Sequence, residues 1–429
     1  MIRSSRHSFD ILNAGKFSEV QILIDEYRRF CRVLIDQIWE SGVAGTPFCP
    51  TQNKLGGLPK FLPSDFLNAH ESWLSGRMKQ ACGKQAISML QAATEKRRKQ
   101  FFVLKKRQKA GVPVKFLQSK IDRTPLVKPR CHQINPELDS RFVDFKKDEG
   151  SKFEFVRIRS IGSTQAHIKI PISETKMSKK WANKGIRKIC IRLADDHFDL
   201  IFDIPNAPVS GDRTIGADQG ISTCLSLSNG MTTQKCIHGH DLSSIMKGMS
   251  RKKSGSKGFQ RAQDHRTNYI NWSLNQFRSS FKDVKEVRLE KIHQIRKGRS
   301  DTGRFRSHWT YTEIKTKLTR LGEEEGFLLC EVSNEFRSQR CSVCGWVRKA
   351  NRKGKTFSCT SALCLYKQDA DMNAASNLEL DLFEIPRWVR LRQMNLKGFF
   401  WKNCGLFTET QERIVPETEK TDHGIEDML

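Results

Sequence analysis

The amino-acid sequence predicts a multidomain α+β protein, with a helical region first, a small β domain next and an α/β region after it. Three observations support this order. Apolar residues recur every three or four positions in the N-terminal part, they alternate with polar residues between about 130 and 207, and strand and helix patterns interchange from Thr214 onward. A chain of 429 residues is long enough for two to four such domains.

A helical domain is expected over residues 17–129. From Phe17 to about Trp39 the apolar side chains follow the rhythm of an amphipathic helix, and 42–64 has the Gly, Pro and Thr content of a loop. A second helical stretch starts near Ser64 and runs into a very basic segment. Such a segment is often only a solvated helix face, but its length favours phosphate contact. Its candidate nucleic-acid-binding residues are Lys96, Arg97, Arg98, Lys105, Lys106 and Arg107.

A small antiparallel β domain, expected to close as a β-barrel, is predicted over 130–207. Period-two alternation in Phe153–Ile158, in His167–Ile170 and between Ile189 and Phe202 supports it. Residues 1–16 are expected to add an N-terminal strand to this domain. Two prolines, Pro205 and Pro208, mark the link to the following α/β region.

The charge balance predicts a polyanionic partner. The chain has 75 Lys and Arg against 47 Asp and Glu, a net charge of +28. Nucleic acid is favoured over an anionic membrane because neither terminus carries a strongly amphipathic basic helix. Since no apolar run approaches the ~20 residues needed to cross a bilayer, and no apolar segment follows the basic N-terminus, we expect a cytoplasmic protein without membrane contact.

One cysteine cluster predicts a zinc site. Of 13 cysteines, nine are isolated among apolar neighbours, as expected for small core residues in a reducing compartment. The other four form two pairs, Cys341-x2-Cys344 and Cys359-x4-Cys364, separated by a basic spacer of 14 residues. Paired cysteines at this separation suit one tetrahedral Zn²⁺. The alternative is a reduced, metal-free loop.

Three carboxylates stand out by their context. Asp218 ends a predicted strand, with a further strand expected from about Ser222, and Glu290 closes the apolar stretch Val284–Leu289. Asp371 flanks a helix expected to begin at Met372. Any one of them alone is more simply a strand-end or helix-capping acid. Together, one acid from each of three elements can bracket two Mg²⁺ ions about 4 Å apart, the arrangement that cleaves phosphodiesters.

The order of these motifs resembles the C-terminal half of the TnpB nucleases and of the miniature type V (V-F-like) CRISPR effectors. The resemblance covers about 214–380. It rests on Gly216–Ile221, Leu289–Ile292, Ser338–Gly345 and Asp371–Asn377, with further likeness in His265–Asn271 and Trp309–Glu313.

The resemblance implies an RNase H-like, RuvC-type α/β nuclease domain with a zinc-ribbon insert. Asp218, Glu290 and Asp371 would form its catalytic triad and hold two Mg²⁺, and Asp371 is selected over Asp369 because it directly precedes the x-Asn-Ala-Ala run. The nuclease domain would span 208–335 and 368–403, with a target-nucleic-acid-binding insert at 336–367. The upstream helical and β-barrel parts would be the recognition and wedge domains. An acidic, partly disordered tail is expected at 404–429.

The implied function is an RNA-guided DNA endonuclease of the prokaryotic cytosol and nucleoid, which binds guide RNA and double-stranded target DNA, recognises a flanking DNA motif and forms an RNA–DNA heteroduplex. Further basic residues suit contacts along the nucleic-acid backbone: Arg251, Lys252, Lys253, Arg296, Lys297, Arg299, Arg304 and Arg306.

Two alternatives stay open at this point: an unguided RNase H-like, structure-selective nuclease, and a guided DNA-binding repressor that does not cut. The origin and length of the guide, the flanking motif, the role of the tail, and whether the protein acts as a monomer or as a homodimer on one RNA are also left open.

Overall fold

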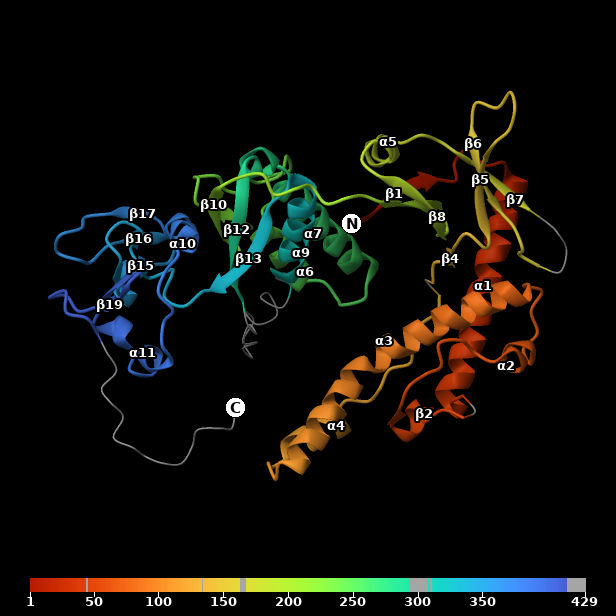
Figure 1. The fold of residues 1–429 in the computed structure, drawn as a ribbon, viewed down its shortest axis with the longest axis horizontal. Helices are drawn as coiled ribbons and strands as arrows, with labels where there is room; N and C mark the ends of the chain where they lie inside the picture. Colours follow the sequence, from red (N-terminus) through yellow and green to blue (C-terminus); the bar gives the residue numbers. More distant parts are fainter. Residues whose placement is uncertain (44, 133, 163–166, 293–307, 309–310, 415–429) are drawn as a thin grey trace. The chain divides into compact units, whose positions relative to one another are not determined.

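The computed structural model describes residues 1–43, 45–132, 134–162, 167–292, 308 and 311–414 (Figure 1). The chain divides into two compact units, Met1–Pro205 and Asn206–Leu429. This division lies close to the expected link at Pro205 and Pro208. The finer domain boundaries stay predictions.

Four helices form the helical part of the first unit: α1 (Ala14–Ser41), α2 (Ser64–Asn68), α3 (Gly76–Lys109) and α4 (Lys115–Asp122). The Asn13 side chain caps α1 by accepting a hydrogen bond from the Lys16 amide, and Ser75 caps α3 in the same way through Met78. One apolar face of each long helix is buried, and α1 packs against α3. Between them, the expected loop contains a short hairpin, β2 (Phe48–Cys49) and β3 (Lys54–Leu55).

The strands of the first unit form two antiparallel sheets. One has the order β1-β9-β8-β4, with β1 (Ile2–Ser8), β4 (Glu137–Leu138), β8 (Ile186–Leu193) and β9 (His197–Asp203). The other has the order β5-β6-β7, with β5 (Val143–Lys147), β6 (Glu154–Ile158) and β7 (Ile168–Ile172). Helix α5 (Lys176–Ala182) connects β7 to β8. Both sheets and the long helices share one hydrophobic core.

The expected closed β-barrel is not present in the described residues, and this prediction is wrong. No ladder of backbone hydrogen bonds joins the two sheets there, because β8 pairs with β9 and β4 while β5 pairs only with β6. A register irregularity between Arg187 and Ile191 interrupts β8. Irregularities of this kind leave residues of a strand unpaired and locally disrupt its ladder of hydrogen bonds.

The second unit is built on a mixed sheet with the order β11-β10-β12-β13. The strands are β10 (Arg213–Asp218), β11 (Ser226–Leu227), β12 (Val284–Lys291) and β13 (Leu328–Ser333); β10, β12 and β13 run parallel, and β11 pairs antiparallel to β10. Helices α6 (Leu242–Ser250), α7 (Lys257–Asn275) and α9 (Tyr311–Glu325) connect the parallel strands and pack on one another. The strand expected from Ser222 instead begins at Ser226, because residues 219–225 form the turn after Asp218.

The cysteine insert and the helix that follows it complete this unit. The insert contains β14 (Trp346–Val347) and the three-stranded sheet β15 (Arg352–Lys353), β16 (Thr356–Ser358) and β17 (Lys367–Asp369). Helix α10 (Ala370–Glu379) then returns to the central sheet. Helix α11 (Arg387–Leu391) precedes β18 (Phe399–Lys402) and β19 (Gly405–Phe407), which pair beside β14.

The folded chain extends past the boundary expected at 403. Gly405–Phe407 form a strand, Leu406 is buried, and the amide of Ile414 donates to the carbonyl of Leu406. The sequence did not predict this strand, because it is only three residues long and lies beside an acidic segment. Residues 415–429 lie outside the described residues.

Close contact between α10 and β10 depends on Gly216. A Cβ atom at this position would lie 1.9 Å from the carbonyl oxygen of Ala375 and 2.6 Å from the amide of Glu379, both on α10. Backbone atoms cannot move aside as a flexible side chain can. Glycine is therefore required for the helix to lie against the strand.

We predict that Gly216→Ala destabilises the second unit. The added methyl group must push α10 away from β10, and overpacking of this kind costs about 1–3 kcal/mol or more. Gly248→Ala on α6 is the matched control, because a Cβ atom there meets nothing within 4 Å and replacing a helical glycine with alanine is expected to stabilise by about 0.4–1 kcal/mol. Thermal denaturation of both variants measures the difference. An equal midpoint for Gly216→Ala and the wild type would contradict the prediction.

Candidate active site and zinc centre

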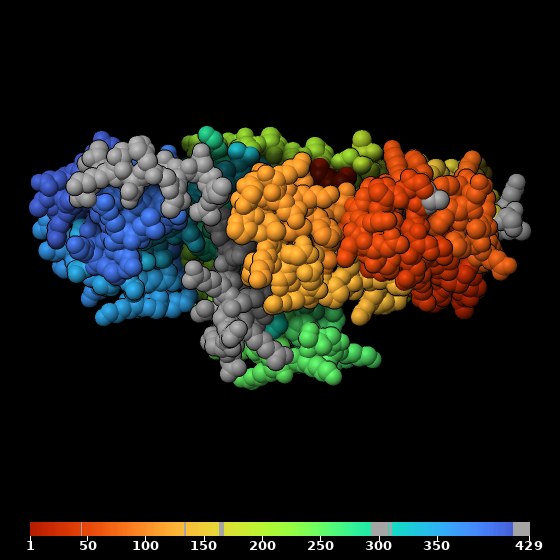
Figure 2. All heavy atoms as spheres, turned by 90° about the horizontal axis from the view of Figure 1, so that it is seen from below, coloured from red at the N-terminus to blue at the C-terminus, as the bar shows by residue number. Residues whose placement is uncertain are grey.

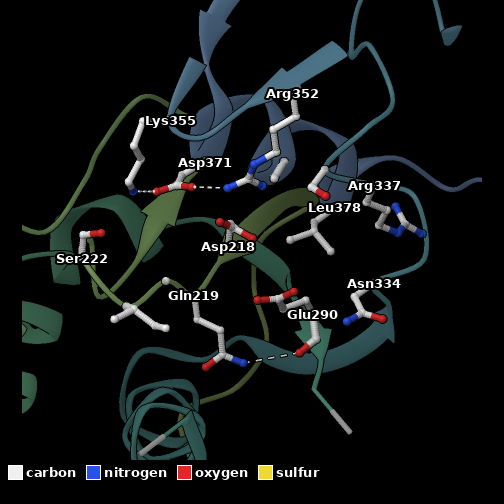
Figure 3. A pocket seen from close by; sticks show the side chains of 14 residues that line it. Asp218, Gln219, Ser222, Glu290, Asn334, Arg337, Arg352, Lys355, Asp371 and Leu378 are labelled. Atoms are coloured by element: carbon white, nitrogen blue, oxygen red, sulfur yellow. Dashed lines mark hydrogen bonds and ion pairs between the residues drawn. The ribbon is translucent and has the colours of Figure 1, made fainter. Parts of the chain in front are cut away.

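The three predicted carboxylates meet in one cavity. Asp218 ends β10 and Glu290 lies near the end of the parallel neighbour β12, so both stand at the carboxyl edge of the sheet. Helix α10 brings Asp371 to the same edge. All three line a cavity of about 380 Å³, and their side chains point into it (Figure 3).

The structure separates the roles of Asp369 and Asp371. Helix α10 begins at Ala370 rather than Met372, and Asp369 is its N-cap: the carboxylate accepts hydrogen bonds from the amides of Asp371 and Met372 at 2.9 and 3.2 Å. The expectation that Asp371 flanks the helix is therefore wrong by two residues, because Asp371 lies within the first turn. Because Asp369 satisfies the helix end, the Asp371 carboxylate is left to face the cavity.

Burial and mutual repulsion disfavour three negative charges in this cavity. Desolvation raises the pKa of Asp218 well above its ordinary value, and the neighbouring carboxylates of Glu290 and Asp371 raise it further. Burial also raises the pKa of Glu290, to about 7. A cation that enters the cavity would favour the ionised form of both acids. Oxygen ligands that converge on one cavity fit hard cations such as Mg²⁺.

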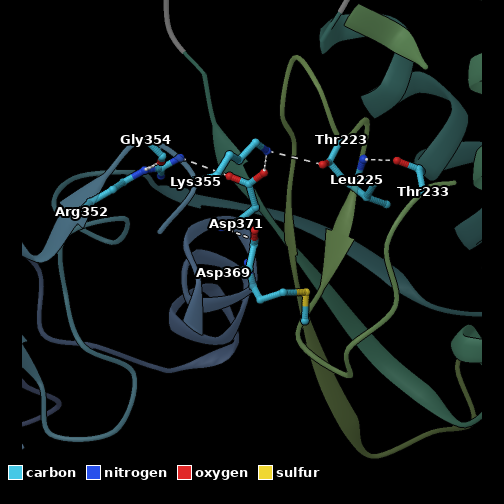
Figure 4. A network of polar contacts seen from close by, with 9 residues as sticks. Thr223, Leu225, Thr233, Arg352, Gly354, Lys355, Asp369 and Asp371 are labelled. Atoms are coloured by element: carbon cyan, nitrogen blue, oxygen red, sulfur yellow. Dashed lines mark hydrogen bonds and ion pairs between the residues drawn. The ribbon is translucent and has the colours of Figure 1, made fainter. Parts of the chain in front are cut away.

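Two cations from the cysteine insert contact Asp371 (Figure 4). Arg352 donates from its guanidinium to Oδ1 at 3.1 Å, and the Lys355 ammonium contacts Oδ2. Lys355 occupies the tip of the β15–β16 hairpin, whose two-residue turn places Gly354 at φ +60°. The insert therefore supplies positive charge directly to the cavity, which Arg337 also lines.

Several residues of the cavity were not singled out from the sequence. In the sequence Arg352 is one residue of the basic spacer, and no pattern marks Lys355, Arg337 or Gln219 as site residues. The side-chain amide of Gln219 donates to the backbone carbonyl of Glu290 at 3.4 Å. No local signal reveals Lys355, since its role depends on where the hairpin turns. The position of Gln219 directly after Asp218 is a signal that could have found it.

The four predicted cysteines form a ready metal site. Their sulfur atoms all lie within 4.8 Å of one another, with Cys341 and Cys364 Sγ 3.8 Å apart and Cys344 and Cys359 Sγ 3.6 Å apart. Four Zn–S bonds of about 2.3 Å in a tetrahedron require sulfur atoms about 3.8 Å apart. The hydrogen bond from the Cys344 thiol lowers the pKa of Cys341 to about 5, while the same contact raises the pKa of Cys344. One thiolate, on Cys341, is therefore favoured without a metal. The residues therefore fit one Zn²⁺.

The four-residue gap between Cys359 and Cys364 does not displace the fourth sulfur. This gap is two residues longer than the gap between Cys341 and Cys344. A turn, in which the Cys364 amide donates to the Ser361 carbonyl, accommodates the additional residues and leaves the Leu363 side chain fully exposed.

The predicted nucleic-acid-binding residues differ in placement. On α3, whose surface is coloured orange in Figure 2, Lys96, Lys105, Lys106 and Arg107 are exposed and Arg98 is half-buried. Arg97 is buried, and its guanidinium contacts the carbonyl of Thr124. It therefore ties α3 to the chain just after α4, because its position on the helix points inward.

The remaining predicted contacts lie in the second unit. Arg251, Lys252 and Lys253 are exposed after the end of α6. Arg296, Lys297, Arg299, Arg304 and Arg306 lie outside the described residues. Among the helices that the structure describes, none has the length and apolar character of a membrane span.

Taken together, the second unit is an α/β domain with a carboxylate-lined cavity and a four-cysteine insert. A family model described as Cas12f1-like, TNB domain matches residues 311–378, which include all four cysteines and Asp371. The match confirms the predicted relationship: the chain carries the sequence features of the miniature type V effector family in this region.

Two curated relatives match over short segments. The CRISPR-associated endodeoxyribonuclease Cas12f1 of Sulfoacidibacillus thermotolerans is 35% identical over 96 residues, covering 22% of this chain and 21% of the relative. The protein of the same name from Syntrophomonas palmitatica is 30% identical over 76 residues, covering 17% and 14%. The aligned segments thus span about a fifth or less of these relatives.

Solved structures of guided nucleases are also similar to this chain. A Cas12f1–sgRNA–target DNA complex matches with a TM-score of 0.44 and 15% identity, covering 89% of this chain and 99% of that one. The mini RNA-guided endonuclease CRISPR-Cas_phi3 matches with a TM-score of 0.23 and 21% identity, covering 29% and 21%.

We predict that Glu290→Gln stabilises the magnesium-free protein at pH 8 and has a smaller effect at pH 5. The folded-state pKa of about 7 lies above the ordinary value of about 4.3. Between these values the folded chain holds a proton that the unfolded chain has lost, so stability falls as pH rises through this window. A glutamine at position 290 does not ionise, so the variant does not lose stability as the pH rises through this window.

Glu286→Gln on the same strand is the control for this experiment. Burial would raise the pKa of Glu286, but its hydrogen bond with Arg288 lowers the pKa overall, so this substitution should not stabilise at pH 8. Melting curves at both pH values decide the matter. A stabilisation by Glu290→Gln of the same size at pH 5 and pH 8 would refute the assignment.

Proposed function

We propose that this protein is an RNA-guided DNA endonuclease that cuts phosphodiester bonds in one RuvC-type, RNase H-like site. The observation that carries the proposal is the convergence of Asp218, Glu290 and Asp371 from three elements into one cavity beside a four-thiol site. The parallel strands β10, β12 and β13 with antiparallel β11 also support an RNase H-like sheet. The names of the curated relatives support the nuclease class.

The three carboxylates would hold two Mg²⁺ ions, which supply Lewis-acid stabilisation of the attacking and leaving oxygens of the phosphodiester. The chain itself orients this chemistry. Strand ends and a capped helix fix the three acids, and Arg352, Lys355 and Arg337 place positive charge where the scissile phosphate and its developing charge would lie.

The insert is suited to nucleic acid. From 336 to 368 the sequence contains no Asp or Glu, and its cations are Arg337, Arg340, Arg348, Lys349, Arg352, Lys353, Lys355 and Lys367. One Zn²⁺ on the four thiolates would hold this small segment together, since metal binding supplies folding free energy that so short a chain lacks. The segment would present backbone-binding charge next to the cavity.

Guidance by RNA is supported by the net charge of +28 and by the exposed basic residues of α3. An unguided nuclease has no need of the first unit, which takes up 205 residues. We propose guide RNA and double-stranded target DNA as the partners, with a homodimer on one RNA as the assembly to be tested by mass determination of the complex.

We predict that Asp371→Asn lowers the DNA cleavage rate by about a thousandfold or more, since loss of a metal ligand removes several kcal/mol of transition-state stabilisation. Asp218→Asn and Glu290→Gln should do the same, while guide-dependent DNA binding persists in all three. Asp369→Asn is the matched control: an asparagine still caps α10, so most activity should remain.

A cleavage gel and a binding assay on these four variants give the answer. An inactive Asp369→Asn beside an active Asp371→Asn would move the site by two residues. Cleavage by all four variants would overturn the nuclease proposal, and binding without cleavage by the wild type would favour the repressor alternative.

We also predict that the purified protein contains RNA. Its excess positive charge should retain a guide at moderate salt and give a high 260/280 nm absorbance ratio. RNase treatment should remove both the RNA and sequence-directed cleavage, and sequencing the released RNA identifies the guide. Undiminished, sequence-indifferent cutting by the RNase-treated protein would instead favour the unguided alternative.

A further inference from the structure

Helix α10 contacts the cavity on one side and the cysteine insert on the other. Asp371 faces the cavity, and Asn373, two residues later, projects to nearly the opposite side of the helix. Asn377 lies one turn after Asn373 on that second side. Both asparagines are fully buried. Buried amides persist in a core only when partners satisfy them, so their partners identify what they hold.

Asn373 binds the backbone of the first cysteine pair. Its Oδ1 accepts a hydrogen bond from the amide of Ser342 at 3.0 Å, and its Nδ2 donates to the carbonyl of Arg340 at 2.8 Å. Ser342 lies between Cys341 and Cys344. The turn that holds two of the four thiols is therefore bonded directly to the helix that carries Asp371.

Asn377 adds a second attachment. Its Nδ2 donates to the carbonyls of Arg337 at 3.0 Å and of Arg340 at 2.7 Å, and its Oδ1 accepts from the Arg340 guanidinium at 2.6 Å. The same guanidinium also donates to the carbonyls of Cys341 and Trp401. A buried guanidinium surrounded by neutral acceptors favours nearby negative charge, and a zinc ion held by four thiolates carries net negative charge.

We propose that Asn373 and Asn377 are positioning residues through which the zinc site fixes the place of Asp371, so that zinc binding and divalent-cation binding at the carboxylates are thermodynamically linked. This inference rests on the proposed function, because it takes Asp371 as a metal ligand. Neither Asn373 nor Asn377 is among the residues that line the cavity. They act by holding α10 in register with the cysteine turn.

Reciprocity follows from the linkage. If zinc strengthens cation binding at the carboxylates, occupation of the carboxylates must strengthen zinc binding by the same factor. Couplings between sites in proteins are typically about 5- to 150-fold. Substitution of the joining amides should abolish this factor while both sets of ligands are still present.

The test measures Mn²⁺ affinity by electron paramagnetic resonance on full-length protein freed of nucleic acid, with zinc content determined by elemental analysis. Asn373→Leu, which is similar in size but forms neither hydrogen bond, should retain zinc and bind Mn²⁺ about tenfold more weakly than the wild type. Ser376→Ala on the same helix is the control and should bind Mn²⁺ normally, because the Ser376 hydroxyl donates within α10, to the carbonyl of Met372. If Asn373→Leu loses zinc, Asn377→Leu carries the same test.

Two further measurements distinguish positioning from general damage. In cleavage assays, the Mg²⁺ concentration for half-maximal rate should rise about tenfold in Asn373→Leu, and the rate at saturating Mg²⁺ should return toward that of the wild type. Zinc removal should weaken Mn²⁺ binding in the wild type and have little further effect in Asn373→Leu. Unchanged Mn²⁺ affinity in zinc-loaded Asn373→Leu, or fully additive effects of the substitution and zinc removal, would overturn the inference.

Asp371→Asn separates failure of this inference from failure of the proposed site. If Asp371→Asn leaves Mn²⁺ binding unchanged, the assignment of Asp371 as a metal ligand is wrong, and the inference falls with it. If Asp371→Asn weakens Mn²⁺ binding and the asparagine substitutions do not, the site stands and only the linkage is refuted.

Discussion

The arrangement of the second unit depends on the contact between α10 and the strand β10. This contact exists because Gly216 has no side chain where the carbonyl of Ala375 and the amide of Glu379 lie. With the helix against the strand, Asp371 comes beside Asp218 at the carboxyl edge of the sheet, and Glu290 joins them from the adjacent parallel strand. The cavity is therefore a consequence of how closely a helix approaches a sheet. All three acids of the cavity belong to strands or to a helix, and none of them lies in a loop.

Charge balance around the cavity follows from the same packing. Three acids line it, and Arg337, Arg352 and Lys355 line it as well. Two of these cations come from the β15–β16 hairpin, so the insert neutralises part of the charge that burial makes unfavourable. A divalent cation entering the cavity would change both the ionisation of the acids and their pairing with the insert.

The differences between expectation and structure share a physical origin. Alternation in the first unit located most strands but not their partners, because pairing depends on twist and on the register irregularity in β8. Arg97 belongs to a basic run in sequence, yet its place on α3 turns it inward. Asp369, and not Asp371, caps α10, because the helix begins at Ala370 and not at Met372. For the strands and for Arg97 the local pattern was correct and the neighbour in space was unknown, whereas the start of α10 was itself misplaced by two residues.

The sequence by itself determined the order of helical, β and α/β parts, the three acids, the four cysteines and the family that they resemble, because these depend on periodicity, residue chemistry and spacing along the chain. Only the tertiary structure decided that Lys355 and Arg352 meet Asp371, that Asn373 and Asn377 join the cysteine turn to α10, and that the β strands form two sheets. The residues that make those side-chain contacts are 16 to 37 positions apart in the chain. Which of them meet depends on how the helices and strands pack, so spacing along the sequence does not predict these contacts.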